Sequence, residues 1–348
     1  MIIVMRPHSS DAELDAVTAL IASLKLAAHV SKGQERTVVG VVGAADDKET
    51  LLAHFSQLEG VESVVPISRS YKLVSKEGRP ARSVVRVREG ISFGGPTLAV
   101  CAGPCSVESR EQLETAAAGV AQAGANLLRG GAFKPRTSPY AFQGLGEEGL
   151  KLLREAADRN GLAVVTEVLD PRDVELVMRY ADMLQIGARN MQNFTLLREA
   201  GQAQHPVLLK RGIAATIDEW LMAAEYVFAA GNHQVVLCER GIRSYDSHTR
   251  NLLDISAVPV LRALTHLPVI VDPSHGTGVR ALVLPMSLAG IAAGADGLLV
   301  EVHPNPAAAR SDGPQSLTVP NFADLMSRLA PVAAAVERSL PAPALALR

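Results

Sequence analysis

The chain has 348 residues, of which 48% are hydrophobic and 20% charged, so it can form one large domain and a smaller one and is too apolar for a disordered chain or a coiled coil. Its 34 basic and 36 acidic side chains give a formal net charge of -2, which excludes a global positive field for a nucleic acid backbone. Its 3 cysteines are too few for a disulfide framework, and its apolar runs are too short for a signal peptide core or a bilayer crossing. We therefore expect a cytoplasmic protein that acts on small molecules rather than on nucleic acid or a membrane.

Residues 1–75 predict a small α+β domain. Their apolar residues alternate between strand and helix periods in the order βαββαβ, which is typical of the ferredoxin-like unit, and Asp11 is expected to cap the first helix. The polar segment 76–96 has no sustained apolar period and is expected to form a linker or a short hairpin. The elements of the small domain are predicted at 2–5, 12–26, 28–31, 37–42, 48–58 and 61–68.

Residues 97–336 repeat one unit eight times: a short apolar strand, a polar loop and a helix of ten to fifteen residues. Eight such units predict a (β/α)8 barrel rather than an open doubly wound sheet, which usually stops at about five or six strands. Cys101 and Cys238 fall within strands and are expected to be core residues, and 337–348 is expected to be a loose tail. The strands are predicted at 98–102, 126–129, 163–167, 183–186, 207–210, 234–238, 269–271 and 297–300.

Six cations lie at the ends of four predicted strands or in the loops after them. A barrel carries its chemistry on these loops, because they all meet at one rim. Any one of the cations could be a solvated loop residue, but converging like charges repel unless anions lie between them, and guanidinium and ammonium groups suit phosphate and carboxylate oxygens. Together the cations predict a site for phosphorylated, carboxylated ligands. They are Arg129, Lys134, Arg136, Arg189, Lys210 and Arg240.

Four potential metal ligands also follow predicted strands. Cys105 follows the first strand, His275 the seventh, and Glu301 and Asp312 the eighth. Barrel closure makes the eighth and first strands neighbours, and a thiolate, an imidazole and two carboxylates form a mixed soft and hard set for a borderline divalent ion. Each residue alone would more often fill the core or pair with a neighbour, and no short-range cysteine spacing supports a zinc site. Manganese, iron, cobalt and zinc all stay open on this argument.

Seven short motifs follow one another along the predicted barrel. They are AGPCSVE at 102–108, LRGGAFKPRTS at 128–138, QIGARN at 185–190, LKRG at 209–212, CERG at 238–241, DPSH at 272–275 and EVHP at 301–304. In this order they resemble the 3-deoxy-D-arabino-heptulosonate 7-phosphate (DAHP) synthase family. Seven motifs in one order identify a family far more specifically than any single motif does.

The resemblance implies a condensation of phosphoenolpyruvate with D-erythrose 4-phosphate and water, which yields DAHP and phosphate as the first step of the shikimate pathway to aromatic amino acids. It implies that Cys105, His275, Glu301 and Asp312 hold one divalent metal ion, for which we expect manganese, with iron, cobalt or zinc as alternatives. Carbon 3 of phosphoenolpyruvate is a weak nucleophile, so a Lewis acid at the aldehyde oxygen would assist its attack. We expect Lys134, Cys105 and His275 to be catalytic, with Lys134 as the hypothesised proton donor to the new hydroxyl.

The resemblance also divides the rim residues between the two substrates. One set is expected at the carboxylate and phosphate of phosphoenolpyruvate, and a second set at the phosphate of erythrose 4-phosphate. The residues are Arg129 and Lys134 for the carboxylate, Ala188, Arg189, Lys210 and Arg240 for the phosphoenolpyruvate phosphate, and Arg136 and Thr137 for the sugar phosphate.

The small N-terminal domain resembles the ferredoxin-like regulatory domain of one branch of this family. That resemblance is architectural and implies inhibition by tyrosine or phenylalanine, and members of the branch are commonly homotetramers. The sequence decides neither the effector nor how the loop after the sixth barrel strand closes, where 244–248 look less constrained than their flanks.

Two alternative functions stay open. 3-Deoxy-D-manno-octulosonate 8-phosphate synthase uses arabinose 5-phosphate on a similar barrel, but its members typically carry an asparagine-containing variant of the segment that reads KPRTS at 134–138 here. A metal-dependent barrel hydrolase would be expected to carry several His and Asp ligands, rather than one Cys, one His and a set of anion-binding cations.

Overall fold

The computed structural model describes residues 1–33, 36–42, 48–65, 70–134 and 140–343. The chain divides into two compact units, Met1–Ser70 and Tyr71–Arg348, each with buried apolar clusters of its own. No helix within the described ranges has both the length and the apolarity needed to span a membrane.

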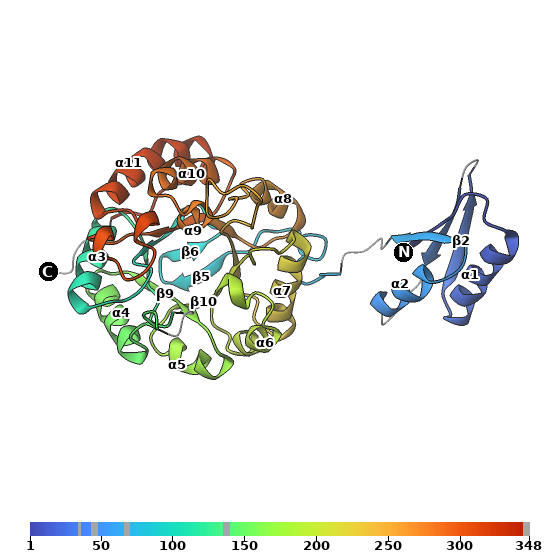
Figure 1. Ribbon diagram of the computed structural model, residues 1–348, viewed down its shortest axis with the longest axis horizontal. Helices are drawn as coiled ribbons and strands as arrows, with labels where there is room; N and C mark the ends of the chain where they lie inside the picture. The colour runs from blue at the N-terminus through green and yellow to red at the C-terminus, as the bar shows by residue number, and fades with distance from the viewer. Residues whose placement is uncertain (34–35, 43–47, 66–69, 135–139, 344–348) are drawn as a thin grey trace. The chain divides into compact units, whose positions relative to one another are not determined.

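The first unit is an antiparallel sheet in the order β2-β3-β1-β4 with two helices, which confirms the predicted ferredoxin-like fold (Figure 1). Alternate residues of the inner strands, such as Ile3, Met5 and Val39, lie in one buried cluster with Val17 and Phe55 of the helices. This cluster excludes water from one face of the sheet. The elements are β1 (Ile2–Met5), α1 (Asp11–Ser23), β2 (Ala27–Lys32), β3 (Thr37–Val42), α2 (Lys48–Ser56) and β4 (Val61–Val65).

The cap of helix α1 differs from the prediction. Ser10, not Asp11, is the N-cap: its hydroxyl accepts the N–H of Glu13 at 3.3 Å, and the Glu13 carboxylate accepts the N–H of Ser10 at 2.6 Å. This reciprocal pair is a capping box, and Asp11 lies in the first turn, where a negative charge favours the helix dipole. The helix also ends before the predicted residue 26, because Lys25 adopts a left-handed conformation with φ at 58°.

The second unit is a closed barrel of parallel strands in the order β10-β11-β12-β13-β14-β7-β8-β9, which confirms the predicted (β/α)8 fold. Every strand begins and ends within one residue of its predicted position. The strands are β7 (Ala99–Gly103), β8 (Leu127–Arg129), β9 (Ala163–Val168), β10 (Met183–Ile186), β11 (Val207–Lys210), β12 (Val235–Glu239), β13 (Val269–Val271) and β14 (Gly297–Glu301).

The helices form a ring around these strands (Figure 1). Several are shorter than the ten residues expected, and α5 has only 5, because Pro171 starts a separate 3-10 turn, Pro171–Asp173, before it. The helices are α3 (Arg110–Gln122), α4 (Glu147–Arg159), α5 (Val174–Met178), α6 (Phe194–Gln202), α7 (Ile217–Ala229), α8 (Ala257–Leu264), α9 (Pro273–Thr277), α10 (Arg280–Ala292) and α11 (Val319–Ala335).

A hairpin closes the amino-terminal end of the barrel. Strands β5 (Val85–Arg88) and β6 (Ile91–Phe93) pair across a turn at Gly90, whose φ is 74°. Val85 and Phe93 are buried in the same cluster as the inward-facing residues of the barrel strands, including Cys101 and Cys238. The hairpin therefore acts as a hydrophobic plug, and the open end of the barrel is at the carboxyl ends of its strands.

The segment that precedes this hairpin is fixed to the outside of the barrel. The carboxylate of Glu225, in α7, accepts the backbone N–H groups of Lys72 and Leu73 at 2.9 Å and of Val74 at 3.0 Å. Nε2 of the buried His266 lies 2.9 Å from the carbonyl oxygen of Leu73. Four hydrogen bonds over three residues thus order the first residues of the second unit.

Asp296, just before β14, holds two arginines at the barrel end. Its fully buried carboxylate accepts Nη2 of Arg82 and Nη2 of Arg338 at 2.6 Å each, and the N–H of Val269 at 2.9 Å. Asp296→Ala is expected to lower the free energy of unfolding by about 3 kcal/mol, since it leaves both guanidinium groups without their buried partner. Urea unfolding would measure this change.

The matched control is Asp324→Ala, which removes an exposed pair with Arg328 at 3.1 Å within α11. An exposed pair of this kind contributes about 0.5 kcal/mol or less. Equal urea midpoints for the two variants would show that the Asp296 cluster adds nothing to stability.

Candidate active site

The four potential metal ligands lie together at the carboxyl end of the barrel. Cys105 follows β7, His275 lies in the short helix α9 after β13, Glu301 is the last residue of β14, and Asp312 lies in the loop beyond it. One donor atom from each residue lies within 4.8 Å of the others. Glu301 is fully buried and Cys105 nearly so, and the other two are partly buried. Neighbouring strands β13, β14 and β7 thus bring together residues that are far apart in the sequence.

The donor groups contact one another directly. The thiol of Cys105 donates to Oδ2 of Asp312 at 3.0 Å, and Nε2 of His275 lies 3.2 Å from Oε1 of Glu301. The ammonium group of Lys134 lies 3.0 Å from the sulfur of Cys105 and 3.0 Å from its carbonyl oxygen. The five side chains therefore converge on one small volume.

In the metal-free cluster His275 and Asp312 have the protonation states that a cation needs, and Cys105 does not. Burial, together with the negative charge of Glu301, raises the pKa of the Cys105 thiol to about 12. Burial lowers the pKa of His275, so that its imidazole is neutral at pH 7. Although burial opposes it, the hydrogen bond from Cys105 holds the pKa of Asp312 below its usual range. A cation would favour the thiolate, and sulfur, nitrogen and carboxylate oxygens together fit a borderline divalent ion.

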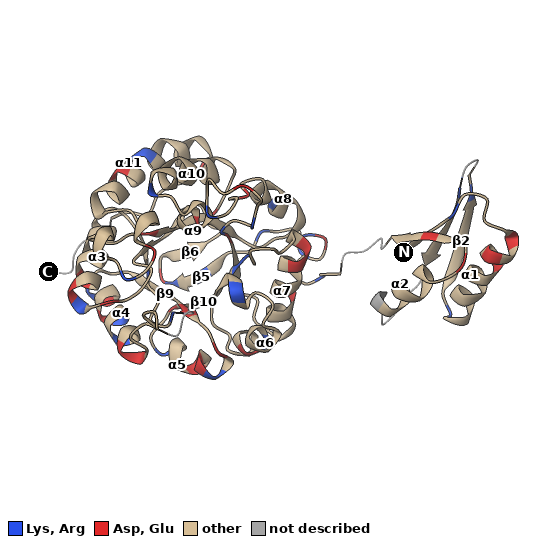
Figure 2. Cartoon of the chain, viewed as in Figure 1, with Lys and Arg blue, Asp and Glu red and all other residues tan. Residues whose placement is uncertain are grey.

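A cavity of about 100 Å³ adjoins the donors, and half of the residues that line it are Lys or Arg. Figure 2 shows Lys and Arg on strands and loops around the barrel axis. The predicted residues Arg136 and Thr137 lie outside the described part of the chain. The other predicted substrate residues all line this cavity, and they are Arg129, Lys134, Ala188, Arg189, Lys210 and Arg240.

Two of these cations have buried carboxylate partners. Nη1 of Arg129 lies 3.0 Å from Oε1 of Glu301, and Nζ of Lys210 lies 2.7 Å from Oδ2 of Asp272. Arg240 is buried and forms no ion pair among the described residues, and burial lowers its pKa. The cavity therefore holds uncompensated positive charge that a multiply charged anion would balance.

Some lining residues were not predicted. Glu167 lies in β9, at the position that ended the predicted third strand, so the strand-end argument that found Lys210 could have found it. Gln185 is the first residue of the QIGARN motif, but its uncharged amide does not mark it as a ligand-binding residue. Arg250 pairs with Asp312 at 3.2 Å, and its long loop has no periodicity that would place it. The sequence thus identified the charge-rich strand ends and missed residues placed by loop conformation.

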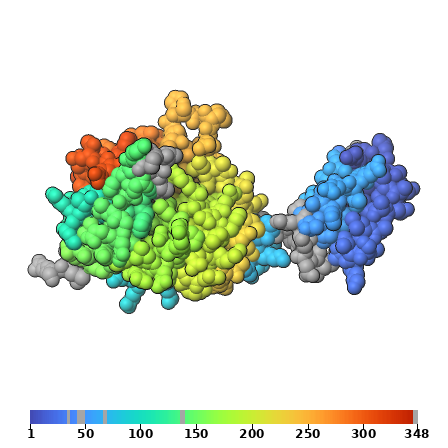
Figure 3. Space-filling model, turned by 60° about the horizontal axis from the view of Figure 1, so that its bottom comes forward, coloured from blue at the N-terminus to red at the C-terminus, as the bar shows by residue number. Residues whose placement is uncertain are grey.

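The loop after β12 lies beside the donors. Ile242 and Leu252 form an antiparallel bridge at its base, and Arg250 connects it to the loop after β14. Tyr245 at its tip is fully exposed. Figure 3 shows this segment, in orange, projecting from the barrel. The loop is thus fixed at its base, next to the site.

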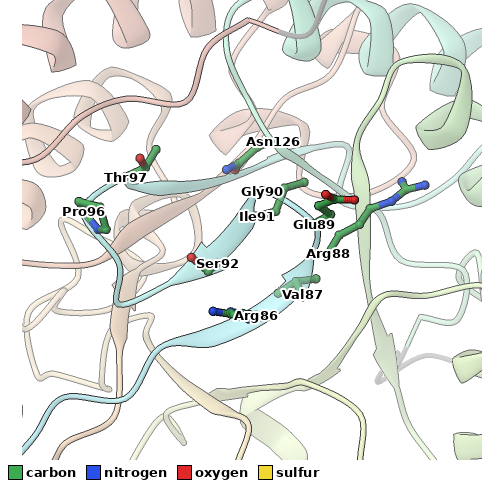
Figure 4. A pocket seen from close by; sticks show the side chains of 10 residues that line it. All are labelled: Arg86, Val87, Arg88, Glu89, Gly90, Ile91, Ser92, Pro96, Thr97 and Asn126. Atoms are coloured by element: carbon green, nitrogen blue, oxygen red, sulfur yellow. The ribbon is translucent and has the colours of Figure 1, made fainter.

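A larger hollow of about 660 Å³ lies at the other end of the barrel, beside the β5–β6 hairpin (Figure 4). Thr97 and Asn126, which precede β7 and β8, complete its wall. Arg88 already donates to the carbonyl oxygen of Leu162 at 3.1 Å, and the described lining contains no cluster of metal ligands. Barrels carry their chemistry at the carboxyl ends of the strands, so we assign the candidate active site to the smaller, cation-lined cavity.

Both units have relatives among known proteins. Residues 80–336 match the DAHP synthetase I family, and residues 1–69 match the DAHP synthase ferredoxin-like domain. A phospho-2-dehydro-3-deoxyheptonate aldolase of Thermotoga maritima is 51% identical, over 97% of this chain and 98% of its own. A crystal structure of the DAHP synthase of that organism has a TM-score of 0.92 at 50% identity, with 97% and 98% of the two chains covered. A 2-dehydro-3-deoxyphosphooctonate aldolase of Fusobacterium nucleatum is 31% identical, over 70% of this chain and 94% of its own.

Proposed function

We propose which substrate group, proton or metal ion each rim residue binds in this chain, which belongs to the DAHP synthetase I family. The chain is a DAHP synthase, which condenses phosphoenolpyruvate with erythrose 4-phosphate and water to give DAHP and phosphate, the first step of the shikimate pathway. The octulosonate alternative is distant, at 31% identity against 51%. These roles rest on one observation: His275 and Asp312, two of the four clustered metal donors, also line the cation-rich cavity at the same rim.

Phosphoenolpyruvate is assigned to the cation-lined cavity. Buried Arg240 supports this assignment, because a phosphate dianion would supply the ion pair that Arg240 does not form with any residue the structure describes. Cations at that phosphate also stabilise its departure when the carbon–oxygen bond of the hemiketal intermediate breaks. The proposed contacts are Arg129 and Lys134 for the carboxylate, and Ala188, Arg189, Lys210 and Arg240 for the phosphate.

Lys134 is assigned a second role as proton donor. Its ammonium group lies 3.0 Å from the sulfur of Cys105, and so it lies between the metal donors and the anion cavity. Attack by carbon 3 of phosphoenolpyruvate turns the aldehyde oxygen into an alkoxide and leaves positive charge at carbon 2, which water captures. An ammonium group at this position can protonate the alkoxide. Arg136 and Thr137 are proposed to bind the phosphate of erythrose 4-phosphate.

The family is metal-dependent, and Cys105, His275, Glu301 and Asp312 form the candidate metal site. Their donor chemistry fits manganese, which we propose as the physiological ion, and also fits iron, cobalt and zinc. Bound there, the ion would act as a Lewis acid toward the aldehyde substrate. Cys105 and His275 are catalytic in the sense that they hold this ion.

The reaction and the metal are tested together with the full chain. Phosphate release is expected with phosphoenolpyruvate and erythrose 4-phosphate and not with arabinose 5-phosphate. Turnover is expected to stop after treatment with a chelator and to return with Mn²⁺, because the donor set cannot polarise the aldehyde without a cation. A colorimetric phosphate assay measures both effects. Turnover with the five-carbon sugar alone, or turnover that survives metal removal, would contradict the assignment.

Regulation and assembly are proposed from the first unit. Residues 1–69 match the DAHP synthase ferredoxin-like domain, which supports a regulatory role in which tyrosine or phenylalanine inhibits a cytoplasmic homotetramer. Steady-state rates with each amino acid, and light scattering after size exclusion, test the two parts separately. Rates that neither amino acid changes would contradict the regulatory role, and a monomer mass would contradict the tetramer.

A further inference from the structure

We propose that Asp272 is a positioning residue that couples metal binding to phosphoenolpyruvate binding, because one of its oxygens holds both His275 and Lys210. The proposal rests on the substrate and metal roles given above. It assigns a function to a buried carboxylate that neither binds substrate nor belongs to the four-donor set.

Among the described residues, the hydrogen bonds and ion pairs of the Asp272 side chain are all to His275 or Lys210. Oδ2 lies 2.8 Å from Nδ1 of His275 and 2.7 Å from Nζ of Lys210, and Oδ1 accepts the backbone N–H of His275 at 3.0 Å. The carboxylate is fully buried. The backbone N–H of Asp272 donates to the carbonyl oxygen of Glu239 at 2.8 Å, which fixes the Asp272 backbone to the neighbouring strand β12. Asp272 is therefore held rigidly between the two sites.

The contact with Nδ1 fixes the tautomer of His275. A neutral imidazole that donates from Nδ1 keeps the lone pair on Nε2, the nitrogen that lies 3.2 Å from Oε1 of Glu301 in the donor cluster. A carboxylate behind a metal-binding histidine orients the ring and increases its basicity. Asp272 thus prepares Nε2 as the ligand atom.

The contact with Lys210 uses the same oxygen, so the two partners compete for its negative charge. A cation on Nε2 makes the Nδ1–H of His275 a stronger donor and strengthens its hydrogen bond to Oδ2 of Asp272. The ion pair between Oδ2 and Lys210 then weakens, so the ammonium group of Lys210 binds a phosphate more readily. A phosphate on Lys210 in turn leaves more of the carboxylate charge for His275. Both shifts favour joint occupancy, so the coupling is positive, and linkage makes it reciprocal.

Two other acidic groups near the cavity do not make this connection. Glu239 and Asp254 pair with Nη1 of Arg211 at 2.9 Å and 3.0 Å. Neither has a hydrogen bond or ion pair with His275 or Lys210 among the described residues. Asp254, which is partly exposed, therefore offers a control carboxylate that stands outside this connection.

The test is calorimetric titration of phosphoenolpyruvate into the full chain without sugar, either metal-free or saturated with Mn²⁺. In the parent, Mn²⁺ is expected to tighten phosphoenolpyruvate binding by about 5-fold or more, in the usual range of coupling between sites. In Asp272→Asn the ratio of the two dissociation constants is expected to fall below the parental value, because the variant removes the Asp272 link and leaves only Oε1 of Glu301, which lies 3.2 Å from Nε2 of His275 and 3.0 Å from Nη1 of Arg129. Mn²⁺ binding itself, followed by electron paramagnetic resonance, is expected to weaken by about 10–100-fold. Asp254→Asn is expected to keep the parental ratio.

The outcomes separate the proposal from the function on which it rests. A parent that does not bind phosphoenolpyruvate would contradict the proposed substrate roles. A parent that binds it equally with and without Mn²⁺, or an Asp272→Asn variant with the parental ratio, would overturn the coupling alone. If Asp272→Asn does not fold, Asp272→Glu keeps the charge but displaces the oxygen by one methylene, and an unchanged ratio there would also overturn it.

Discussion

Cys105→Ala is expected to lower kcat by at least about 100-fold, since loss of a ligand atom should cost no less than the 10–100-fold that follows loss of a group behind a ligand. Alanine leaves His275, Glu301 and Asp312 in place, so the fold should survive. Steady-state phosphate release at saturating Mn²⁺ measures the loss. Cys101→Ala is the control, because it removes another buried thiol, in β7, that does not reach the donor cluster. Equal kcat in the two variants would exclude Cys105 as a ligand.

The same variant tests the pH dependence of metal binding. With its pKa raised to about 12, the Cys105 thiol of the metal-free protein keeps its proton across the neutral range, whereas a metal ligand must be a thiolate. Binding therefore releases one proton, and Mn²⁺ affinity is expected to rise by about tenfold for each pH unit, with rising pH favouring the bound state. Burial keeps His275 neutral in this range, so it adds no second proton. A flat profile in the parent, or the full slope in Cys105→Ala, would contradict this prediction.

Lys134→Met is expected to lower kcat by about 10²–10⁴-fold, the usual contribution of a positioned general acid. Methionine keeps most of the side-chain volume and removes only the ammonium group that lies 3.0 Å from the sulfur of Cys105. Because Lys134 is also assigned to the phosphoenolpyruvate carboxylate, binding must be measured separately by calorimetry. A loss of affinity with unchanged kcat would leave Lys134 a binding role only.

Lys151→Met is the control for this substitution. Lys151 lies on the exposed side of α4 and its nearest acidic partner, Glu147, is 3.7 Å away. The same change of charge and volume is therefore made away from the rim, and turnover is expected to be unchanged. If Lys134→Met matched this control in both affinity and turnover, Lys134 would have neither role.

The barrel strands were predictable because they are buried on both faces. Parallel strands covered by helices consist of continuous apolar residues, such as Val269–Val271, and their positions are clear in the sequence. The strand ends were less clear where polar residues or glycine continue the ladder. Gly103, Glu239 and Glu301 each lie one residue beyond a predicted strand. In the structure Glu301 pairs with Gly103, and Glu239 pairs with Val271, so all three are strand residues.

The candidate site was predictable in its charges and not in their pairing. Lys210 and Arg211 are adjacent in the sequence, yet only Lys210 lines the cavity, while Arg211 forms buried ion pairs with Glu239 and Asp254. A position at a strand end predicts where the backbone of a residue lies, but it does not show which group the side chain contacts. The sharing of Asp272 by two partners brings Lys210 at the end of β11 to the segment after β13, so no local pattern in the sequence could indicate it.

The closure of the barrel by β14 and β7 has a consequence for how the protein is made. Residues 99–103 pair with residues 297–301, so the ladder cannot close until the last strand has left the ribosome. The first unit has its own core and can fold while the rest is still being synthesised. Until the last strand pairs, the nascent sheet exposes strand edges that can pair with other chains. The risk of aggregation during synthesis is therefore concentrated in the interval between the emergence of β7 and that of β14.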